Sequence, residues 1–274
     1  MSSIAPPRVD ELAQHAQEIR RTVIRMCMGR GQGYAGQGLA LADLVACLYF
    51  DELRRDEEGA FRDHLVLSTG HSAIALFAGL GELGIYDLAE LETYGLDGSR
   101  IEESPLEGTP GFEITGGSLG QGLSQAVGMA LGERLSGRGG RVYCLLSDGE
   151  LQEGAVWEAA MAAGHYRLDD LVALVDNNHM QADGATADIM GVEPIPEKFE
   201  SFGFASRRID ANSVDEVLAG FEYARATRGR PTALVCETIP GKGVPSFEMY
   251  EKVHYIRAAP EVWRRALEEL APRG

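Results

Sequence analysis

The 274-residue sequence predicts an α/β protein in which a parallel sheet is covered by helices on both faces. Two observations lead to this fold class. Several short runs are apolar at successive positions, which is typical of strands that are buried on both faces. These runs alternate with longer segments of helical spacing, as in sheets whose crossover connections are helices. The predicted strands are residues 65–68, 141–146, 171–175, 205–209 and 232–237.

The predicted helices lie before, between and after these strands. The first helix is amphipathic, because apolar residues such as Leu12, Ile19 and Val23 recur on one face. A glycine-rich segment, residues 29–38, interrupts this pattern, and helical spacing then resumes. At the other end, residues 258–270 form either a terminal helix or the start of a linker. The expected helices, beginning with the first, are residues 9–28, 39–50, 72–83, 118–135, 151–165 and 214–225.

Residues 97–117 are rich in Gly, Glu, Pro and Ser and predict a long loop. Loops of this length in a compact domain are usually functional or mobile, so we expect this loop to belong to an active site. The sequence contains no internal repeat and no low-complexity segment. We therefore expect residues 1–274 to form a single domain.

Charge and hydropathy exclude several classes of function. The formal net charge of −17 argues against binding to nucleic acid or to an anionic membrane surface, because both need positive patches. No stretch approaches the ~20 apolar residues of a membrane span, and the N-terminus lacks the pattern of a secretory signal. The cysteines are scattered in apolar stretches without metal-ligand spacing, so we expect buried free thiols and a cytoplasmic protein. They are Cys27, Cys47, Cys144 and Cys236.

Polar residues directly follow two of the predicted strands. Asp148 and Gly149 come after the second strand, and Asn177 and Asn178 come after the third. Ligands of open parallel sheets gather at the carboxyl ends of the strands, so both clusters are expected to face one site. Carboxylate and amide oxygens suit Mg²⁺, which completes its octahedron with phosphate oxygens and water. The alternative interpretation is that each cluster is an ordinary turn.

The residues around these clusters resemble the transketolase family. Asp148-Gly149 followed by Asn177-Asn178 is similar to the thiamine-diphosphate motif, and three further segments are similar to transketolase signatures. These segments are LSTGH at 67–71, GTPGFEITGGSLGQG at 108–122 and DGELQEG at 148–154. The resemblance extends from about residue 19 to residue 254, with its motifs in the order of the family. It implies the thiamine-diphosphate-binding fold for the predicted α/β domain.

The resemblance also implies a cofactor site. Asp148, Asn178 and the backbone carbonyl of Met180 would hold Mg²⁺, or Ca²⁺ or Mn²⁺ in its place, against the diphosphate of thiamine diphosphate. Gly149 would lie against the diphosphate, and Glu150 is expected among the residues that bind the cofactor. Further cofactor-binding residues, near the aminopyrimidine ring, would be Gly117, Ser118 and Leu119.

Three residues are implied in catalysis. His71 and His254 would line the channel near the thiazolium and the diphosphate, and both would also contact the cofactor. Glu153 would form a hydrogen bond across a subunit interface, toward the catalytic glutamate of a partner.

The resemblance covers only the half of a transketolase that binds the diphosphate. In the family, the glutamate that activates the pyrimidine ring belongs to a second α/β domain, and no sequence for it remains before Gly274. We therefore expect the N-terminal subunit of a split transketolase, inactive alone. Its partner would be a C-terminal subunit carrying the pyrimidine-binding domain, in a heterotetramer with two copies of each. The complex would transfer a two-carbon ketol unit from a ketose, as a sugar or sugar phosphate, to an aldose.

Two positions depart from the family at the substrate end. The segment that typically reads SGHPGG is QGYAGQ at 32–37, so Tyr34 stands where a substrate-contacting histidine is expected. Ser104 lies in a segment that usually reads GHP, again in place of a histidine. Tyrosine donates a hydrogen bond but does not exchange protons near neutral pH as histidine does. Either the loops are aligned with a shift, or the sugar differs from the ordinary pentose phosphates.

Two other functions are compatible with parts of this pattern. A subunit of a 2-oxoacid dehydrogenase, or a deoxyxylulose-phosphate synthase, would share the metal motif, although residues 109–122 fit transketolase better. A non-catalytic scaffold would keep the fold but would be expected to lose site residues first. The residues retained here are Asp148, Asn178, Glu153 and His71.

Overall fold

The computed structural model describes residues 6–114, 117–248, 250 and 252–271, and it contains a five-stranded parallel sheet. The strand order is β2-β3-β4-β8-β7. All five predicted strands are present with boundaries shifted by at most two residues, so the predicted fold class is confirmed. The strands are β2 (His64–Leu67), β3 (Val142–Ser147), β4 (Leu171–Asn177), β7 (Ala205–Asp210) and β8 (Thr232–Glu237).

Each face of the sheet has its own hydrophobic core. Successive side chains of a strand point to opposite faces. In β3, Tyr143 and Leu145 therefore pack in one cluster, whereas Cys144 and Leu146 pack in the other. Because both faces are covered, the strands are apolar at successive positions, as the sequence indicated.

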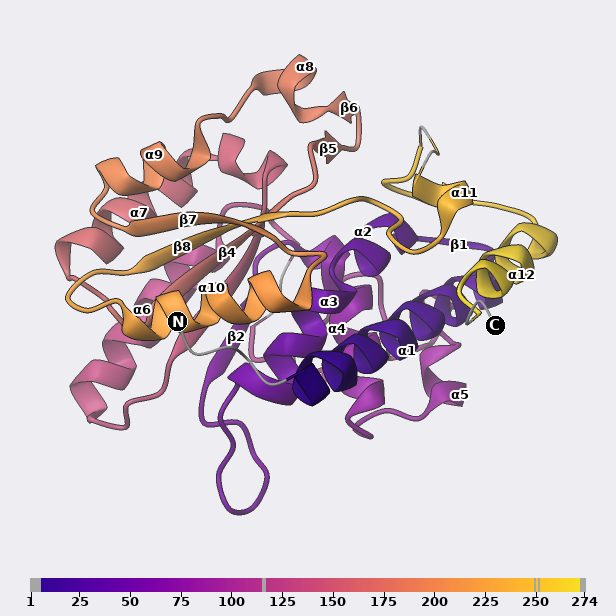
Figure 1. Cartoon of the computed structure of the whole chain (residues 1–274), viewed down its shortest axis with the longest axis horizontal. Coiled ribbons are helices and arrows are strands. Elements are labelled where there is room, and N and C mark those ends of the chain that lie inside the picture. The colour runs from indigo at the N-terminus through magenta and orange to yellow at the C-terminus, as the bar shows by residue number, and fades with distance from the viewer. Residues whose placement is uncertain (1–5, 115–116, 249, 251, 272–274) are drawn as a thin grey trace.

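Helices from different parts of the chain form the two outer layers (Figure 1). One layer includes α1 (Pro6–Arg30), α3 (Ala42–Cys47), α4 (Ala73–Glu82) and α10 (Val214–Ala226). The other includes α6 (Gly122–Ser136), α7 (Gly154–His165) and α9 (Ile195–Ser201). Residues 258–270 contain a terminal helix, α12 (Pro260–Glu269), which packs on α1 and buries Trp263.

Several predicted helices begin later or are broken. The helix expected from residue 118 begins at Gly122, because Gly120 has a left-handed φ of +85° and its N–H is bonded to Glu150. The helix expected from residue 151 is a 3₁₀ turn, Gly149–Gln152, followed by α7. The helix expected from residue 72 is likewise a 3₁₀ turn, Gly70–Ser72, followed by α4. The helix expected over 39–50 is divided into α2 (Ala35–Ala40), α3 and a wider π-helical turn, Leu48–Glu52.

Short elements that the sequence did not predict lie around the carboxyl edge of the sheet. A hairpin joins β5 (Met180–Gln181) to β6 (Gly184–Ala185) and leads into α8 (Thr186–Met190). Strand β1 (Gln32–Gly33) pairs antiparallel with β9 (Ile256–Arg257), which joins the segment after α1 to the segment before α12. The short helices α5 (Leu88–Leu91) and α11 (Pro245–Glu248) complete the elements. The described residues of the predicted loop, 97–114 and 117, contain no helix or strand.

Candidate cofactor and substrate site

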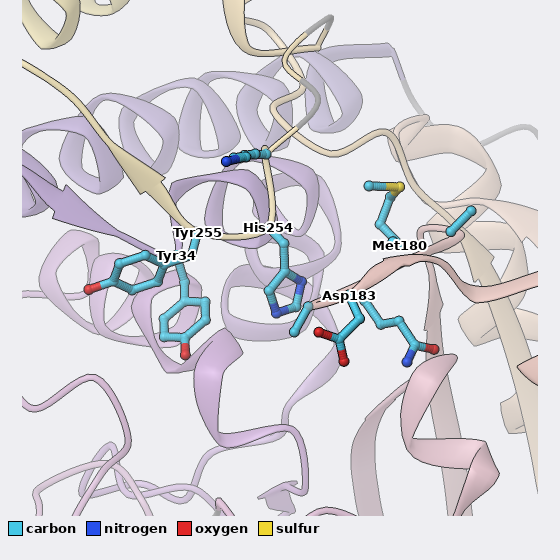
Figure 2. A pocket seen from close by; sticks show the side chains of 10 residues that line it. Tyr34, Met180, Asp183, His254 and Tyr255 are labelled. Atoms are coloured by element: carbon cyan, nitrogen blue, oxygen red, sulfur yellow. The ribbon is translucent and has the colours of Figure 1, made fainter. Parts of the chain in front are cut away.

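Two adjoining cavities lie at the carboxyl edge of the sheet. The smaller, of about 210 Å³, is lined by predicted site residues from five different segments. The larger, of about 640 Å³, is lined by Tyr34 and by the β5–β6 hairpin (Figure 2). Met180 and His254 border both cavities, so the cavities form one continuous site. Predicted residues that line the smaller cavity are His71, Leu119, Gly149, Glu153, Asn178, Met180 and His254.

Asp148 follows the last residue of β3 and is buried, with only 1% of its surface exposed. Its two carboxylate oxygens accept hydrogen bonds from the Gly149 N–H, at 2.8 Å, and from the Thr186 hydroxyl, at 2.9 Å. Burial raises the pKa of Asp148 above its ordinary value, and these hydrogen bonds only partly oppose that rise. Asp148 borders a separate small cavity of about 70 Å³ rather than the two larger ones.

Asn178 follows the last residue of β4, and its amide is held on both sides. The amide nitrogen donates to Asp176, at 2.9 Å, and the amide oxygen accepts from the Met180 N–H, at 2.9 Å. His179 between them adopts a left-handed φ of +60°, which turns the chain so that Met180 faces the cavities. Burial raises the pKa of Asp176 to about 7, with the nearby charge of Asp148 adding to the rise. Two of the metal ligands predicted from the sequence, Asp148 and Asn178, thus directly follow adjacent parallel strands.

The donor set fits a divalent cation that is bound together with a diphosphate. Asp148 is a buried carboxylate with no cationic side chain bonded to it among the described residues. A buried carboxylate of this kind is stabilised by a cation. Among the described residues, no group of three or more His, Cys, Asp or Glu side chains could hold a metal. Phosphate and water oxygens would therefore have to complete the coordination, which is the usual arrangement for Mg²⁺.

Glu150 lies next to this edge but does not line either of the two larger cavities. Its carboxylate is fully buried and accepts hydrogen bonds from the Ser68 hydroxyl, from the Gly120 N–H at 2.6 Å and from the Ser147 N–H at 3.3 Å. It therefore joins β2, β3 and the turn before α6. Glu150 thereby holds in place the segment that carries Leu119, and its expected contact with the cofactor stays a prediction.

Residues 117–119 are exposed, and one of them lines the smaller cavity. Leu119, with 37% of its surface exposed, lines that cavity, whereas Gly117 and Ser118 do not. Gly117 adopts a φ of +135°, which side-chain-bearing residues rarely adopt. An added Cβ there would meet Ser104 Oγ at 3.8 Å, so Ser104 lies beside Gly117 rather than in either cavity. Thr115 and Gly116 of the signature lie outside the described residues.

Three aromatic rings from distant segments meet where the cavities join. The ring centroids of His71 and His254 are 5.2 Å apart, and Tyr34 lies 5.3 Å from His71 and 5.8 Å from His254. Burial, together with the neighbouring His254, lowers the pKa of His71 to about 4. Burial also lowers the pKa of His254. Both imidazoles are therefore neutral near pH 7, and each offers one donor and one acceptor nitrogen.

A chain of contacts connects this cluster to the predicted loop. Tyr34 packs edge-on against Tyr255, with centroids 4.8 Å apart. The Tyr255 hydroxyl donates to Glu103, at 2.7 Å, and Glu103 also pairs with Arg30, at 3.2 Å. Ser104, the next residue, is thereby held near the site although it does not line it.

Some residues that line the larger cavity were missed by the sequence analysis. Asp183 lies at the tip of the β5–β6 hairpin, and Tyr255 follows His254 (Figure 2). Lys252 lines the same cavity. Asp183-Gly184 is a dipeptide typical of turns and could have indicated the hairpin. Lys252 and Tyr255 carried no such signal, because their place depends on the β1–β9 pairing.

The fold and the cavities define an α/β protein with a candidate site at the carboxyl ends of parallel strands, where open sheets of this kind bind their ligands. The family model for the thiamine diphosphate binding domain of transketolase matches residues 12–261. The chain therefore belongs to the transketolase family, as the motifs predicted. Within the described part of the chain, no helix is both long and apolar enough to cross a membrane.

Two relatives match the chain over nearly their whole length. A putative uncharacterized transketolase family protein, y4mO, of Sinorhizobium fredii is 47% identical over 261 residues, which is 93% of this chain and 94% of the relative. The 6-deoxy-6-sulfo-D-fructose transketolase subunit SqwG of Clostridium sp. is 36% identical over 268 residues, covering 96% and 98% respectively.

One solved structure matches nearly all of this chain but is itself matched over less than half of its length. The transketolase of Campylobacter jejuni superposes with a TM-score of 0.87 at 28% identity, covering 96% of this chain and 43% of that one. The chain thus spans less than half of that transketolase. The prediction that it corresponds to the thiamine-diphosphate-binding part of the family is confirmed.

Proposed function

We propose that this chain is the diphosphate-binding subunit of a split transketolase. The complex transfers a two-carbon ketol unit from a ketose to an aldose. The observation that carries this proposal is the convergence of His71, Glu153, Asn178, Met180 and His254 on one cavity. These residues come from four stretches of the sequence, and His71, Glu153 and Asn178 each belong to a segment that resembles a family motif.

The cofactor in this proposal is thiamine diphosphate with a divalent cation, Mg²⁺ or in its place Ca²⁺ or Mn²⁺. When bound, thiamine diphosphate supplies a nucleophilic carbon and an electron sink for breaking the bond beside the sugar carbonyl. Asp148, Asn178 and the Met180 carbonyl would hold the cation. Gly149 would leave room for the diphosphate, since only Gln181 atoms lie near its missing side chain, at 3.4 Å or more.

The substrate part of the proposal rests on the three rings. As neutral groups, His71 and His254 would donate and accept hydrogen bonds with the sugar oxygens and could take up a proton transiently. The Tyr34 phenol would act only as a neutral hydrogen-bonding group, because burial and the charge of Glu103 raise its pKa. Tyr34 would therefore alter which sugar is preferred while leaving the metal site unchanged.

The partner in this proposal is a subunit that carries the pyrimidine-binding domain, with two copies of each chain in the complex. Glu153 supports it, since its side chain is exposed at the cavity edge and could reach a second polypeptide. A relative of almost the same length is called a transketolase subunit. The four buried free cysteines support a reducing, cytoplasmic setting.

The sugar class follows from Tyr34 and from that same relative. The name of the relative specifies a sulfonated, 6-deoxy ketose. We infer that this chain also serves a donor other than the ordinary pentose phosphates, such as a deoxy, branched or sulfonated sugar.

The test is a steady-state assay of the complex with thiamine diphosphate and Mg²⁺. We expect ketol transfer that requires both subunits and that favours a modified ketose over xylulose 5-phosphate with ribose 5-phosphate. Equal use of the pentose phosphates would contradict the altered donor. Decarboxylation of a 2-oxoacid instead would indicate another thiamine-diphosphate enzyme, and failure to bind the cofactor would indicate a scaffold.

A further inference from the structure

Gln37 makes a contact that connects the glycine-rich segment to the candidate site. Its side chain is 2% exposed, on α2, and its Nε2 lies 2.6 Å from Nδ1 of His254. The two residues are 217 positions apart in the sequence. Gln37 occupies the last position of the 32–37 segment, where the family typically has glycine, so the family pattern supplies no side chain for this contact.

The orientation of the Gln37 amide decides which nitrogen of His254 carries the proton. As placed, Nε2 donates to Nδ1, and Oε1 is buried without a partner among the described residues. The opposite orientation would leave the NH₂ group, with two donors, in that buried position. The opposite orientation is the costlier one because both of its N–H donors would lack a partner, and buried unpaired N–H groups are rarer in proteins than unpaired carbonyl oxygens.

The rest of the His254 ring is consistent with this arrangement. Burial lowers the pKa of His254, so the ring is neutral near pH 7 and one nitrogen is an acceptor. Nε2 accepts or donates no hydrogen bond within the described residues, yet it is not among the buried unpartnered atoms. It therefore reaches solvent, and the ring borders both cavities between Tyr34 and Met180 (Figure 2).

We propose that Gln37 is a positioning residue that fixes His254 as the tautomer protonated on Nε2. His254 then presents a hydrogen-bond donor where the two cavities join, suited to a carbonyl or hydroxyl oxygen of the sugar. This role rests on the proposed function, whereas the tautomer itself does not. His71 and Tyr34 restrain the plane of the ring, but they make no hydrogen bond to it, so the tautomer is set by Gln37.

The test compares Gln37→Glu and Gln37→Leu in the complex with the partner subunit. A carboxylate only accepts hydrogen bonds, so Glu at position 37 requires a proton on Nδ1 of His254. Leu has a side chain of similar volume but leaves Nδ1 of His254 without a partner. Histidine ¹⁵N NMR of the complex without cofactor reports which nitrogen is protonated. We expect Nδ1 of the unmodified complex to be unprotonated and Nδ1 of Gln37→Glu to be protonated. Gln14→Glu, the same change on the exposed face of α1, is the control and should leave His254 unaltered.

Steady-state kinetics provide the second readout. Gln37→Glu should raise the KM for the ketose about tenfold, the effect of one lost hydrogen bond, and Gln37→Leu should raise it less, because Nε2 can still carry the proton. In both variants the affinity for thiamine diphosphate should change less than about threefold. A protonated Nδ1 in the unmodified complex, or an unchanged Nδ1 in Gln37→Glu, would overturn the inference. An inactive complex with the expected tautomer would instead reject the proposed function and leave the positioning of His254 intact.

Discussion

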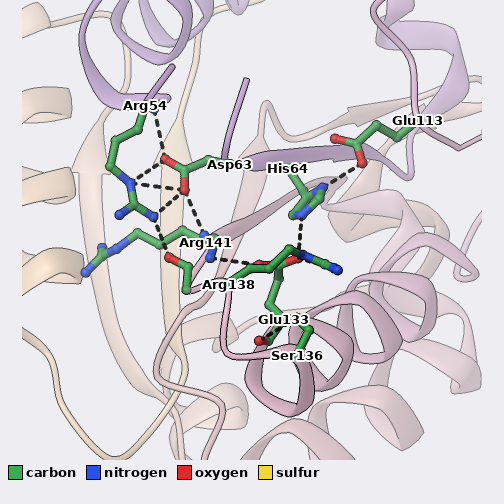
Figure 3. Close-up of polar contacts among 10 residues, drawn as sticks. Arg54, Asp63, His64, Glu113, Glu133, Ser136, Arg138 and Arg141 are labelled. Carbon is green, nitrogen blue, oxygen red and sulfur yellow. Dashed lines mark hydrogen bonds and ion pairs between the residues drawn. The ribbon is translucent and has the colours of Figure 1, made fainter. Parts of the chain in front are cut away.

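His64 and Glu133 face each other at the amino edge of the sheet, with His64 Nε2 3.2 Å from a Glu133 oxygen (Figure 3). The other ring nitrogen of His64 lies 2.6 Å from Glu113, which belongs to the predicted loop. Carboxylates only accept hydrogen bonds when ionised, so both ring nitrogens must carry protons to satisfy this geometry. Hydrogen bonds from Arg138 and the Gly140 N–H keep Glu133 ionised and lower its pKa to about 2. An imidazolium at residue 64 therefore connects the loop to α6.

This geometry predicts a pH-dependent stability. Burial alone would lower the pKa of His64, but the bonds and charges of Glu113 and Glu133 raise it above its ordinary value. A raised folded pKa contributes stability that is complete below the ordinary value and is lost as the pH rises through the folded value. His64→Gln should cost about 1–3 kcal/mol at pH 6 and progressively less at higher pH. Urea unfolding measures this difference, and the exposed His165→Gln should show no such trend.

Asp148→Asn separates metal binding from folding. Asparagine removes the charge that would hold the cation. The affinity for Mg²⁺ with thiamine diphosphate should therefore fall by more than the roughly 10- to 100-fold that follows the loss of a residue which only supports a metal ligand. Because burial raises the pKa of Asp148, its ionised form is costly without a cation, and the metal-free variant should melt no lower than the unmodified chain. Calorimetric titration and thermal melting check the two parts. Exposed Asp188→Asn is the control, and unchanged affinity in Asp148→Asn would exclude this metal site.

Two glycines of α6 should respond in opposite directions to alanine. A Cβ at Gly122 would lie 2.3 Å from Ser68 Cβ, so Gly122→Ala should lose about 1–3 kcal/mol of unfolding free energy through overpacking. A Cβ at Gly128 meets no described atom within 4 Å, and alanine there should add about 0.5–1 kcal/mol through helix propensity. Denaturant unfolding gives both values. Equal effects at the two positions would refute the close approach of α6 to β2.

Glu150→Ala should destabilise the chain without removing a group from either large cavity. It leaves the Ser68 hydroxyl and the Gly120 N–H without their buried acceptor, which costs at least about 1–3 kcal/mol. Glu158→Ala on the exposed side of α7 should stay within about 0.5 kcal/mol of the unmodified chain. A variant as stable as this control would show that Glu150 does not hold the turn before α6.

The sequence was most informative where local pattern and topology agree. The strands were predictable because residues such as Tyr143 and Cys144 serve opposite cores and are therefore both apolar. Asp148 and Asn178 could be brought to one edge because neighbouring parallel strands end on the same side.

Other features depend on contacts that no local pattern encodes. The start of α6 was misplaced, since helical spacing continued through Gly120 while its bond to Glu150 holds a turn there. The contact between Gln37 and His254 joins segments 217 positions apart. The roles of the individual site residues in binding and catalysis stay predictions for the experiments above.

The pairing of β1 with β9 has a consequence for engineering. Tyr34 directly follows β1, and His254 and Tyr255 directly precede β9, so the pairing of these two strands holds this wall of the larger cavity together. Asp148 and Asn178 belong to the central sheet and do not depend on that closure. A proteolytic nick between α11 and β9 would thus release the sugar-facing wall and spare the cation-holding edge. A linker that fuses the partner subunit to this chain should therefore not strain the segment from α11 to α12. If it did, we expect the complex to lose its selectivity for the sugar while it still binds the cofactor.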